Sequence, residues 1–186
     1  MTEATPTAPA APAPVGPVAP VASAPPLPWP VVLTTERLVL RPVERGDVPV
    51  LTRLWTDPEV RRHLGGPVAA TVVEIRRRRC VGARGVFAAV RCDDGEVAGL
   101  VTVGWDAGRG EREVSYQFLP EQWGRGYARE AVTAAVGWAL ADAPSVVAVT
   151  QQANTRSRRL LEAIGMAHVE SFVEWDAHQV LYRVRA

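Results

Sequence analysis

Two glycines, Gly124 and Gly126, lie where a strand-like pattern gives way to a helical one. Before them, residues 113–119 alternate apolar and polar side chains, which is the period of a half-buried strand. After them, from Ala128 onward, alanine and valine recur at the spacing of one helical face. Such a loop presents free backbone N–H groups at the positive end of a helix dipole, so it can hold phosphate or pyrophosphate. The same residues also suit a tight turn that binds no ligand.

The common nucleotide-binding motifs fit this segment poorly. A dinucleotide fold places its glycines directly at the end of a buried apolar strand, with an acidic residue about 20 positions later. Here Pro-Glu-Gln-Trp at residues 120–123 intervenes, and the next expected strand ends in glutamine. A P-loop requires Gly-Lys-Ser/Thr, whereas Gly126 is followed by Tyr127. A nucleotide-dependent oxidoreductase is therefore disfavoured.

A second strand-to-helix unit follows the first. A strand is expected at residues 145–151, Asn154 suits the N-cap of the next helix, and Gly165 suits its end. Together the two units resemble the GNAT superfamily of acetyl-CoA-dependent N-acetyltransferases. The first is similar to the pyrophosphate loop of that family, and the second to its Asn-x-x-Ser-x-x-Leu-Leu-Glu-x-x-Gly helix.

Three further motifs are similar to the RimJ/RimL-like branch, the ribosomal-protein N-acetyltransferase-like sequences. They are Leu-Thr-Thr-Glu-Arg-Leu-Val-Leu-Arg-Pro at residues 33–42, Asp-Pro-Glu-Val at 57–60, and Trp-Gly-Arg-Gly-Tyr-Ala at 123–128. The resemblance extends over residues 31–186. It implies one α/β (α+β) domain of the GNAT type, with a central mixed, mostly antiparallel sheet flanked by helices.

The resemblance also implies how acetyl-CoA binds as cosubstrate. Backbone amides of residues 124–128 would hold the pyrophosphate, the backbone at 118–119 would pair with pantetheine, and a main-chain N–H near Phe118 would polarise the thioester carbonyl. Asn154 and Ser157 would contact the pantetheine arm. The implied cofactor-binding residues are Phe118, Leu119, Gly124, Arg125, Gly126, Tyr127, Ala128, Asn154 and Ser157.

Transfer to an amine also needs a base, because the acceptor is mostly protonated at neutral pH. Related RimJ-like sequences carry glutamate at the position of Glu113, and strand alternation puts Glu111 on the same face as a reserve candidate. Carboxylates are common on exposed strand faces, so a structural role for Glu113 stays open.

Two positions depart from the family pattern. Trp123 stands where many members have Arg or Gln, and Leu161 stands where many have a Tyr that protonates the departing thiolate. Ser157 or water could supply that proton, so the general acid is unassigned.

The first 30 residues differ from the rest in composition. They hold ten of the sixteen prolines and eight alanines, with Glu3 as their one charge. Such a segment cannot bury a core, so we expect a disordered Pro/Ala-rich tail at 1–30 and the catalytic domain at 31–186. It also lacks the basic start and continuous apolar region of a secretion signal, which favours a cytoplasmic protein.

The formal net charge is +1, and no apolar run approaches the length of a membrane span. We therefore expect no membrane association and no nucleic-acid partner. The arginine run at 76–79 suits the solvated end of a helix; the alternative is that it contacts RNA or an acidic substrate. Cys80, Cys92 and the three histidines are scattered, so no metal site is expected and buried, hydrophobe-like cysteines are favoured. His63, beside a Gly-Gly-Pro break, could form part of the acceptor-site wall.

Periodicity gives a coarse element order that matches the family. Strands are expected at 38–43, 86–91, 97–104, 113–119, 145–151, 167–175 and 179–184, and helices at 47–55, 69–78, from 125 and from 154. The leading hypothesis is an N-acetyltransferase acting on a protein N-terminus or a small amine. The alternative is a noncatalytic acetyl-CoA-binding sensor or interaction module, and a homodimer is compatible with either.

Overall fold

A computed structural model describes residues 27–186 of the chain. In chain order its elements are β1 (Leu33–Thr34), β2 (Leu38–Pro42), a 3-10 turn (Arg45–Asp47), α1 (Val48–Thr56), α2 (Ala70–Arg79), β3 (Val86–Arg91), β4 (Val97–Asp106), β5 (Glu111–Phe118), a second 3-10 turn (Pro120–Gln122), α3 (Tyr127–Leu140), β6 (Ser145–Gln151), α4 (Thr155–Ala163), β7 (Ala167–Glu174) and β8 (Ala177–Arg185).

The strands form one eight-stranded sheet in the order β1-β2-β3-β4-β5-β6-β8-β7. Strands β5 and β6 pair in parallel, and the other neighbouring pairs are antiparallel. The parallel ladder is short, because it joins only Arg112 to Val146 and Glu113 to Val147. Beyond that point the two strands diverge, which opens the sheet between its halves.

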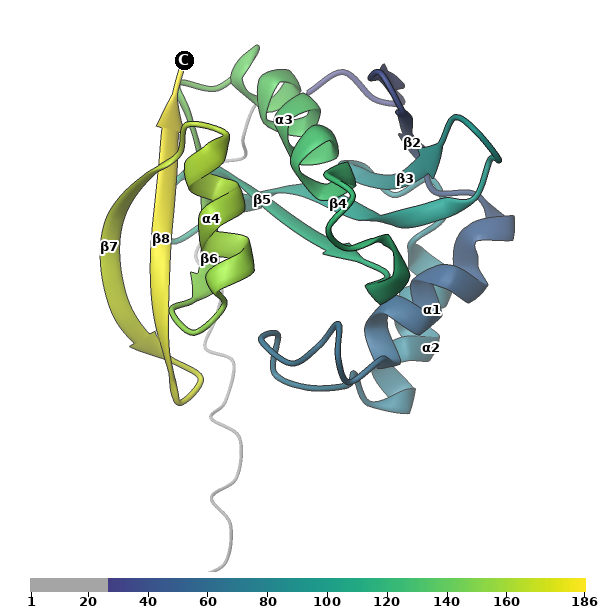
Figure 1. The fold of residues 1–186 in the computed structure, drawn as a ribbon, viewed down its shortest axis with the longest axis horizontal. Coiled ribbons are helices and arrows are strands. Elements are labelled where there is room, and N and C mark those ends of the chain that lie inside the picture. Colours follow the sequence, from purple (N-terminus) through teal and green to yellow (C-terminus); the bar gives the residue numbers. More distant parts are fainter. Residues whose placement is uncertain (1–26) are drawn as a thin grey trace, which may run out of the picture.

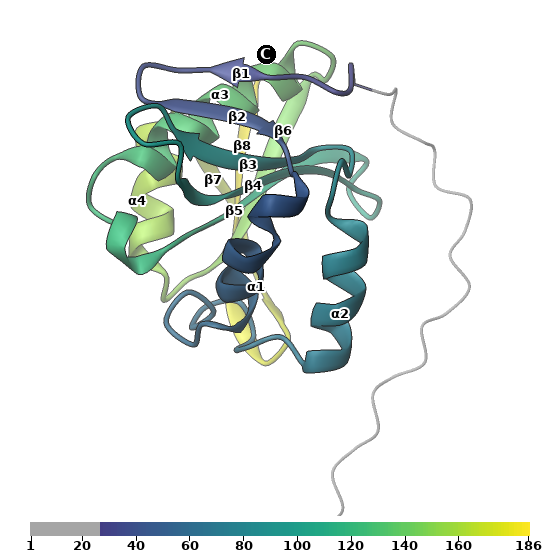
Figure 2. The same cartoon turned by 90° about the vertical axis from the view of Figure 1, so that its right-hand side faces the viewer.

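Helices cover both faces of the sheet (Figures 1 and 2). The apolar stripe of α3, which includes Ala131, Val132 and Ala135, packs on Leu38 and Val114 of one face. Helices α1 and α2 lie on the opposite face of the β2–β4 half, where they bury a second apolar cluster. Successive side chains of a strand point to opposite faces of the sheet, so the same strands contribute different residues to the two clusters. The expected α/β fold with a mixed, mostly antiparallel sheet is confirmed.

The domain begins before residue 31, so the expected boundary is corrected. Leu27 is 3% exposed within the main core, and Trp29 packs edge-on against Phe87 with ring centroids 5.0 Å apart. The Trp29 indole N–H also donates to the carbonyl of Gly82 (3.0 Å). Composition hid these contacts, because two large apolar side chains stand among prolines and alanines. The rest of the expected tail, residues 1–26, lies outside the described residues.

This boundary gives a prediction about truncation. A chain lacking residues 1–30 should unfold at a lower temperature than one lacking 1–26, because it loses the burial of Leu27 and Trp29, worth roughly 2 to 5 kcal/mol. Thermal denaturation of the two truncated proteins side by side measures the difference. Equal midpoints would show that residues 27–30 contribute nothing to the core.

Other differences from expectation are local. Strand β5 begins at Glu111, not at residue 113, and α3 begins at Tyr127, not at 125. Cys80 is buried as expected, but Cys92 is exposed, so the expectation of a buried residue is wrong for Cys92. Within residues 27–186, no helix is long and apolar enough to cross a membrane.

Candidate active site

The divergence of β5 and β6 opens a cavity of about 1190 Å³. Its walls come from β5 residues 114–118, the glycine loop with the start of α3, the second half of β6, and α4. A fifth wall is the segment between α1 and α2, which contributes residues 59, 60 and 62–64. Its volume exceeds that of pockets for drug-sized ligands, which suits a long, nucleotide-like molecule.

One edge of β5 is free to pair with such a molecule. The N–H of Leu119 donates to the carbonyl of Ala98 in β4 (3.0 Å). Successive residues of an antiparallel strand direct their backbone groups to opposite edges, so Phe118 and Tyr116 direct theirs away from β4, toward the cavity. An extended ligand arm can therefore add to β5 as a further strand would.

This geometry corrects the expectation for Leu119. Its N–H is held by Ala98, its carbonyl accepts from the N–H of Gln122 (2.9 Å), and the residue is 5% exposed. The backbone groups of Leu119 are therefore used within the protein, whereas Tyr116 lies on the open edge of β5 and lines the cavity. Phe118 keeps its N–H for a ligand, but its carbonyl accepts from the indole N–H of Trp123 (2.8 Å). Trp123, the departure seen in the sequence, thus ties the glycine loop to the end of β5.

The glycine loop has the geometry of an anion site. Gly124 and Gly126 have φ values of +76° and +83°, in the left-handed region that favours glycine. Gly126 is the N-cap of α3, and no side chain caps that end, so the first N–H groups of the helix stay available to a ligand. Three arginines of α3 and α4 line the same cavity and add positive charge: Arg129, Arg156 and Arg159.

Contacts from Thr35 and Arg37, near the start of the domain, hold the glycine loop and the first turn of α3 in place. We call this set of contacts the Arg37 clamp. The Arg37 guanidinium lies 2.6 Å from the Glu130 carboxylate and donates to the carbonyl of Arg125 (2.9 Å). It also lies 5.0 Å from the ring centre of Tyr127. The hydroxyl of Thr35 donates to Glu130 as well (2.6 Å). Burial would raise the pKa of Glu130, but hydrogen bonds from Thr35 and Arg37 outweigh it and hold that pKa below its ordinary value. Thr35 and Arg37 stand in the motif at 33–42, but nothing in the sequence indicated that they contact the glycine loop.

The start of α4 supplies hydroxyl and amide groups. The side-chain carbonyl of Asn154 accepts from the N–H of Ser157 (3.2 Å), as expected of an N-cap. The hydroxyl of Ser157 lies 2.8 Å from the hydroxyl of Tyr116. Asn154, Ser157 and Tyr116 all line the cavity. Leu161 is 1% exposed and part of the core, so the position of the family's Tyr carries no polar group.

The structure separates the two glutamates proposed as bases. Glu111 accepts from Arg183 at 2.6 and 2.8 Å and from the Ser145 hydroxyl at 2.6 Å. The hydrogen bond from Arg183 is the main reason that the pKa of Glu111 lies below its usual value. A carboxylate stabilised in this way is a weak base, so the structure argues against Glu111 as the reserve candidate.

Glu113 has a different environment. It is the last residue of β5 paired with β6, at the apex where the strands diverge, and it directly precedes the cavity-lining residues. Alternation puts its side chain on the face opposite α3, because Val114 packs into the core beneath that helix. Burial raises the pKa of Glu113, and nearby Asp106 and Glu174 add to the rise against the opposing charge of Arg109. No hydrogen bond or ion pair joins its carboxylate to another described side chain.

The segment between α1 and α2 forms the remaining wall. His63 lines the cavity, and its Nδ1 lies 3.2 Å from the side-chain oxygen of Gln151 at the end of β6. This contact joins the segment to the far side of the cleft. Across residues 27–186, no three His, Cys, Asp or Glu side chains gather in a group that could hold a metal ion.

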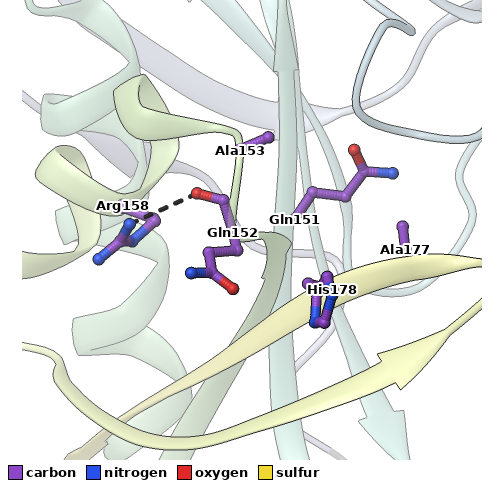
Figure 3. A pocket seen from close by; sticks show the side chains of 6 residues that line it. All are labelled: Gln151, Gln152, Ala153, Arg158, Ala177 and His178. Atoms are coloured by element: carbon purple, nitrogen blue, oxygen red, sulfur yellow. Dashed lines mark hydrogen bonds between the residues drawn. The ribbon is translucent and has the colours of Figure 1, made fainter.

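A second, more open pocket of about 640 Å³ lies beyond the end of β6 (Figure 3). It is lined by Gln151, Gln152, Ala153, Arg158, Ala177 and His178. Arg158 donates to the carbonyl of Gln152 (3.4 Å), and no residue expected at the active site lines this pocket. The groups that could bind a phosphate-bearing thioester gather in the larger cavity.

Comparison with known proteins agrees with this geometry. The family model described as an acetyltransferase (GNAT) domain matches residues 37–167. An uncharacterized N-acetyltransferase p20 of Bacillus licheniformis is 30% identical over 144 residues, which cover 71% of this chain and 80% of that protein.

Two solved structures share the fold. A GNAT-family acetyltransferase from Bacillus anthracis superposes with a TM-score of 0.75 at 21% identity, covering 83% of this chain and 98% of its own. A spermidine N-acetyltransferase from Vibrio cholerae, solved in complex with CoA and spermine, superposes with a TM-score of 0.70 at 18% identity. That match covers 81% of this chain and 96% of the other.

Proposed function

Because the chain belongs to the GNAT acetyltransferase family, we propose that it moves an acetyl group from acetyl-CoA directly to a primary amine on a protein N-terminus or a small molecule. The observation that carries this proposal is the cleft between β5 and β6, which joins a free strand edge to an uncapped glycine loop. Few ligands other than CoA combine a strand-like amide arm with a pyrophosphate.

The residues of the cleft fit the successive parts of acetyl-CoA. Amides of residues 124–128 would hold the pyrophosphate, with the loop kept in place by the Arg37 clamp. The backbone of Tyr116 and Phe118 would pair with the amides of pantetheine, and Asn154 and Ser157 would contact the same arm from α4. The N–H of Phe118 would polarise the thioester carbonyl, which is the main electrostatic contribution to acyl transfer.

Glu113 would accept the proton of the amine. It stands at the apex of the cleft on the face opposite α3, earlier on the same strand as Phe118, so the proton of an acceptor entering from that face would reach it directly or through water. A carboxyl pKa raised toward neutrality improves the match between a base and an ammonium group. His63 and the segment between α1 and α2 would wall the acceptor side.

The acceptor class rests on two different observations. The motifs at 33–42 and 123–128 favour a protein N-terminus, as in RimJ/RimL-like enzymes. The fold shared with the spermidine N-acetyltransferase of Vibrio cholerae favours a small polyamine as the second candidate. We also propose a cytoplasmic location, where ribosomal-protein N-termini and polyamines would be available as acceptors.

An acceptor screen tests the proposal. The full chain is incubated with acetyl-CoA and a panel of amines that includes ribosomal-protein N-terminal peptides and polyamines, and mass spectrometry detects a gain of one acetyl group. We expect acetylation of at least one class, above a control with heat-denatured protein. Tight binding of CoA without transfer to any member would instead support the noncatalytic sensor. Binding of NAD but not CoA would contradict both.

A further inference from the structure

Many relatives have a Tyr in α4 whose phenol protonates the departing thiolate. Here Leu161 stands at that position and is part of the core, so α4 supplies no phenol to the sulfur of CoA. A phenol reaches the same region from a different element. Tyr116 projects from β5 toward α4, and its hydroxyl lies 2.8 Å from that of Ser157 in the first turn of the helix. Both residues line the cavity between β5 and β6.

The number of O–H donors in the Tyr116–Ser157 pair determines whether one is left to bind a ligand. Two hydroxyl groups carry two O–H donors, and the bond between them uses one, so one O–H remains for a third acceptor. A phenol is the more acidic donor and an aliphatic hydroxyl the better acceptor. The favoured arrangement therefore has Tyr116 donating to Ser157, which leaves the Ser157 O–H free to donate into the cavity.

Burial keeps the phenol in its donor form. It raises the pKa of Tyr116 to about 12, against the opposing effect of the bond to Ser157, so the hydroxyl stays protonated over the ordinary working range. Hydrogen bonds in series polarise one another, so a phenol donating to Ser157 makes the Ser157 O–H a stronger donor.

We propose that Tyr116 is a positioning residue for departure of the CoA sulfur and acts through Ser157. The inference rests on the proposed acetyl transfer. In that step the amine nitrogen bonds to the carbonyl carbon, the carbon–sulfur bond breaks, and its electron pair stays on sulfur. The amine proton passes to Glu113. The Ser157 O–H, polarised by Tyr116, donates a hydrogen bond to the sulfur, and the released thiolate takes its proton from water.

A double-mutant cycle tests whether Tyr116 acts through Ser157. With the best acceptor of the amine panel, Tyr116→Phe should lower kcat about 10-fold and Ser157→Ala about 100-fold, with the KM for acetyl-CoA changed less than about 3-fold. The double variant should match Ser157→Ala, because Tyr116 has nothing to polarise once the serine hydroxyl is gone. Losses that multiply in the double variant would show that Tyr116 acts independently, and the proposal would fail.

Tyr182→Phe is the matched control. Tyr182 is also buried, and its hydroxyl donates to Glu162 of α4 (2.7 Å), but it does not line the cavity. Removing its hydroxyl should leave kcat within about 2-fold of wild type, since it perturbs α4 without reaching the sulfur side. A loss of kcat equal to that of Tyr116→Phe would assign both effects to packing and overturn the proposal.

A second readout needs no acceptor. The thiol pKa of CoA bound to the protein is followed by the ultraviolet absorbance of its thiolate. A donor aimed at sulfur stabilises the thiolate, so this pKa should lie below that of free CoA and rise by about half a unit or more in Tyr116→Phe. An unchanged value in that variant would refute the proposal. If wild type acetylates no amine yet shows the shift, the proposed function fails and the hydroxyl pair stands.

Discussion

Replacing Glu113 with glutamine is expected to lower turnover about 100-fold or more near neutral pH, while the affinity for acetyl-CoA stays unchanged. Glutamine keeps the shape of the side chain and removes its basicity. The carboxylate lies outside the cavity walls proposed to hold the cosubstrate, so calorimetric titration with CoA should give the wild-type dissociation constant. Steady-state kinetics with the acceptor identified by the screen measure the loss.

The pH profile identifies the cause of that loss. Burial raises the pKa of Glu113 above the usual carboxyl value, so wild-type activity should fall as the pH drops through that raised pKa. The glutamine variant should lack this acidic limb. Its rate should instead keep rising toward the pKa of the acceptor amine, because alkaline solution supplies the free amine directly. A damaged fold would not recover in this way.

Glu111→Gln provides the matched comparison on the same strand face. It removes a carboxylate that already accepts hydrogen bonds from Arg183 and Ser145, so it should lower the stability of the fold more than the turnover. Wild-type turnover in Glu113→Gln combined with a large loss in Glu111→Gln would transfer the role to Glu111. If both variants turn over normally, neither carboxylate is the base and the assignment is wrong.

Replacing Gly126 with valine is expected to abolish CoA binding. At φ +83° a branched residue is strained, and a Cβ there would lie 3.2 Å from the Arg37 guanidinium. The side chain would also occupy the position from which the pyrophosphate meets the first N–H groups of α3. For wild type, CoA at 100 times its dissociation constant should stabilise the fold by about 2.7 kcal/mol and raise the melting temperature.

Gly95→Val controls for backbone strain alone. Gly95 has φ +75°, lies in the turn between β3 and β4, and has open space around its Cβ position. Both variants should melt earlier than wild type without ligand, but only Gly126→Val should lose the rise in melting temperature on adding CoA. A normal rise in Gly126→Val would show that the pyrophosphate binds elsewhere.

Sequence patterns predicted the elements that short-range physics specifies. Alternation along residues 113–118 predicted β5, the apolar stripe after Gly126 predicted α3, and Asn154 marked the start of α4. Each of these signals lies within one element, where backbone geometry fixes the period and glycine or a capping side chain fixes the end. Because GNAT motifs are carried by such local segments, the family and its cosubstrate could be inferred without coordinates.

The contacts that distinguish the candidate residues were decided by tertiary structure alone. Glu111 and Glu113 look equivalent on a strand, but Arg183, 72 residues further along the chain, neutralises only the first. The Arg37 clamp spans 93 residues to Glu130, and Tyr116 meets Ser157 across 41. No periodicity carries such information, because these partners meet only when the fold brings the β1–β2 connection, β5, β8 and helices α3 and α4 together. The same packing buries Leu27 and places Trp29 against the core, although their surroundings in the sequence predict only a tail.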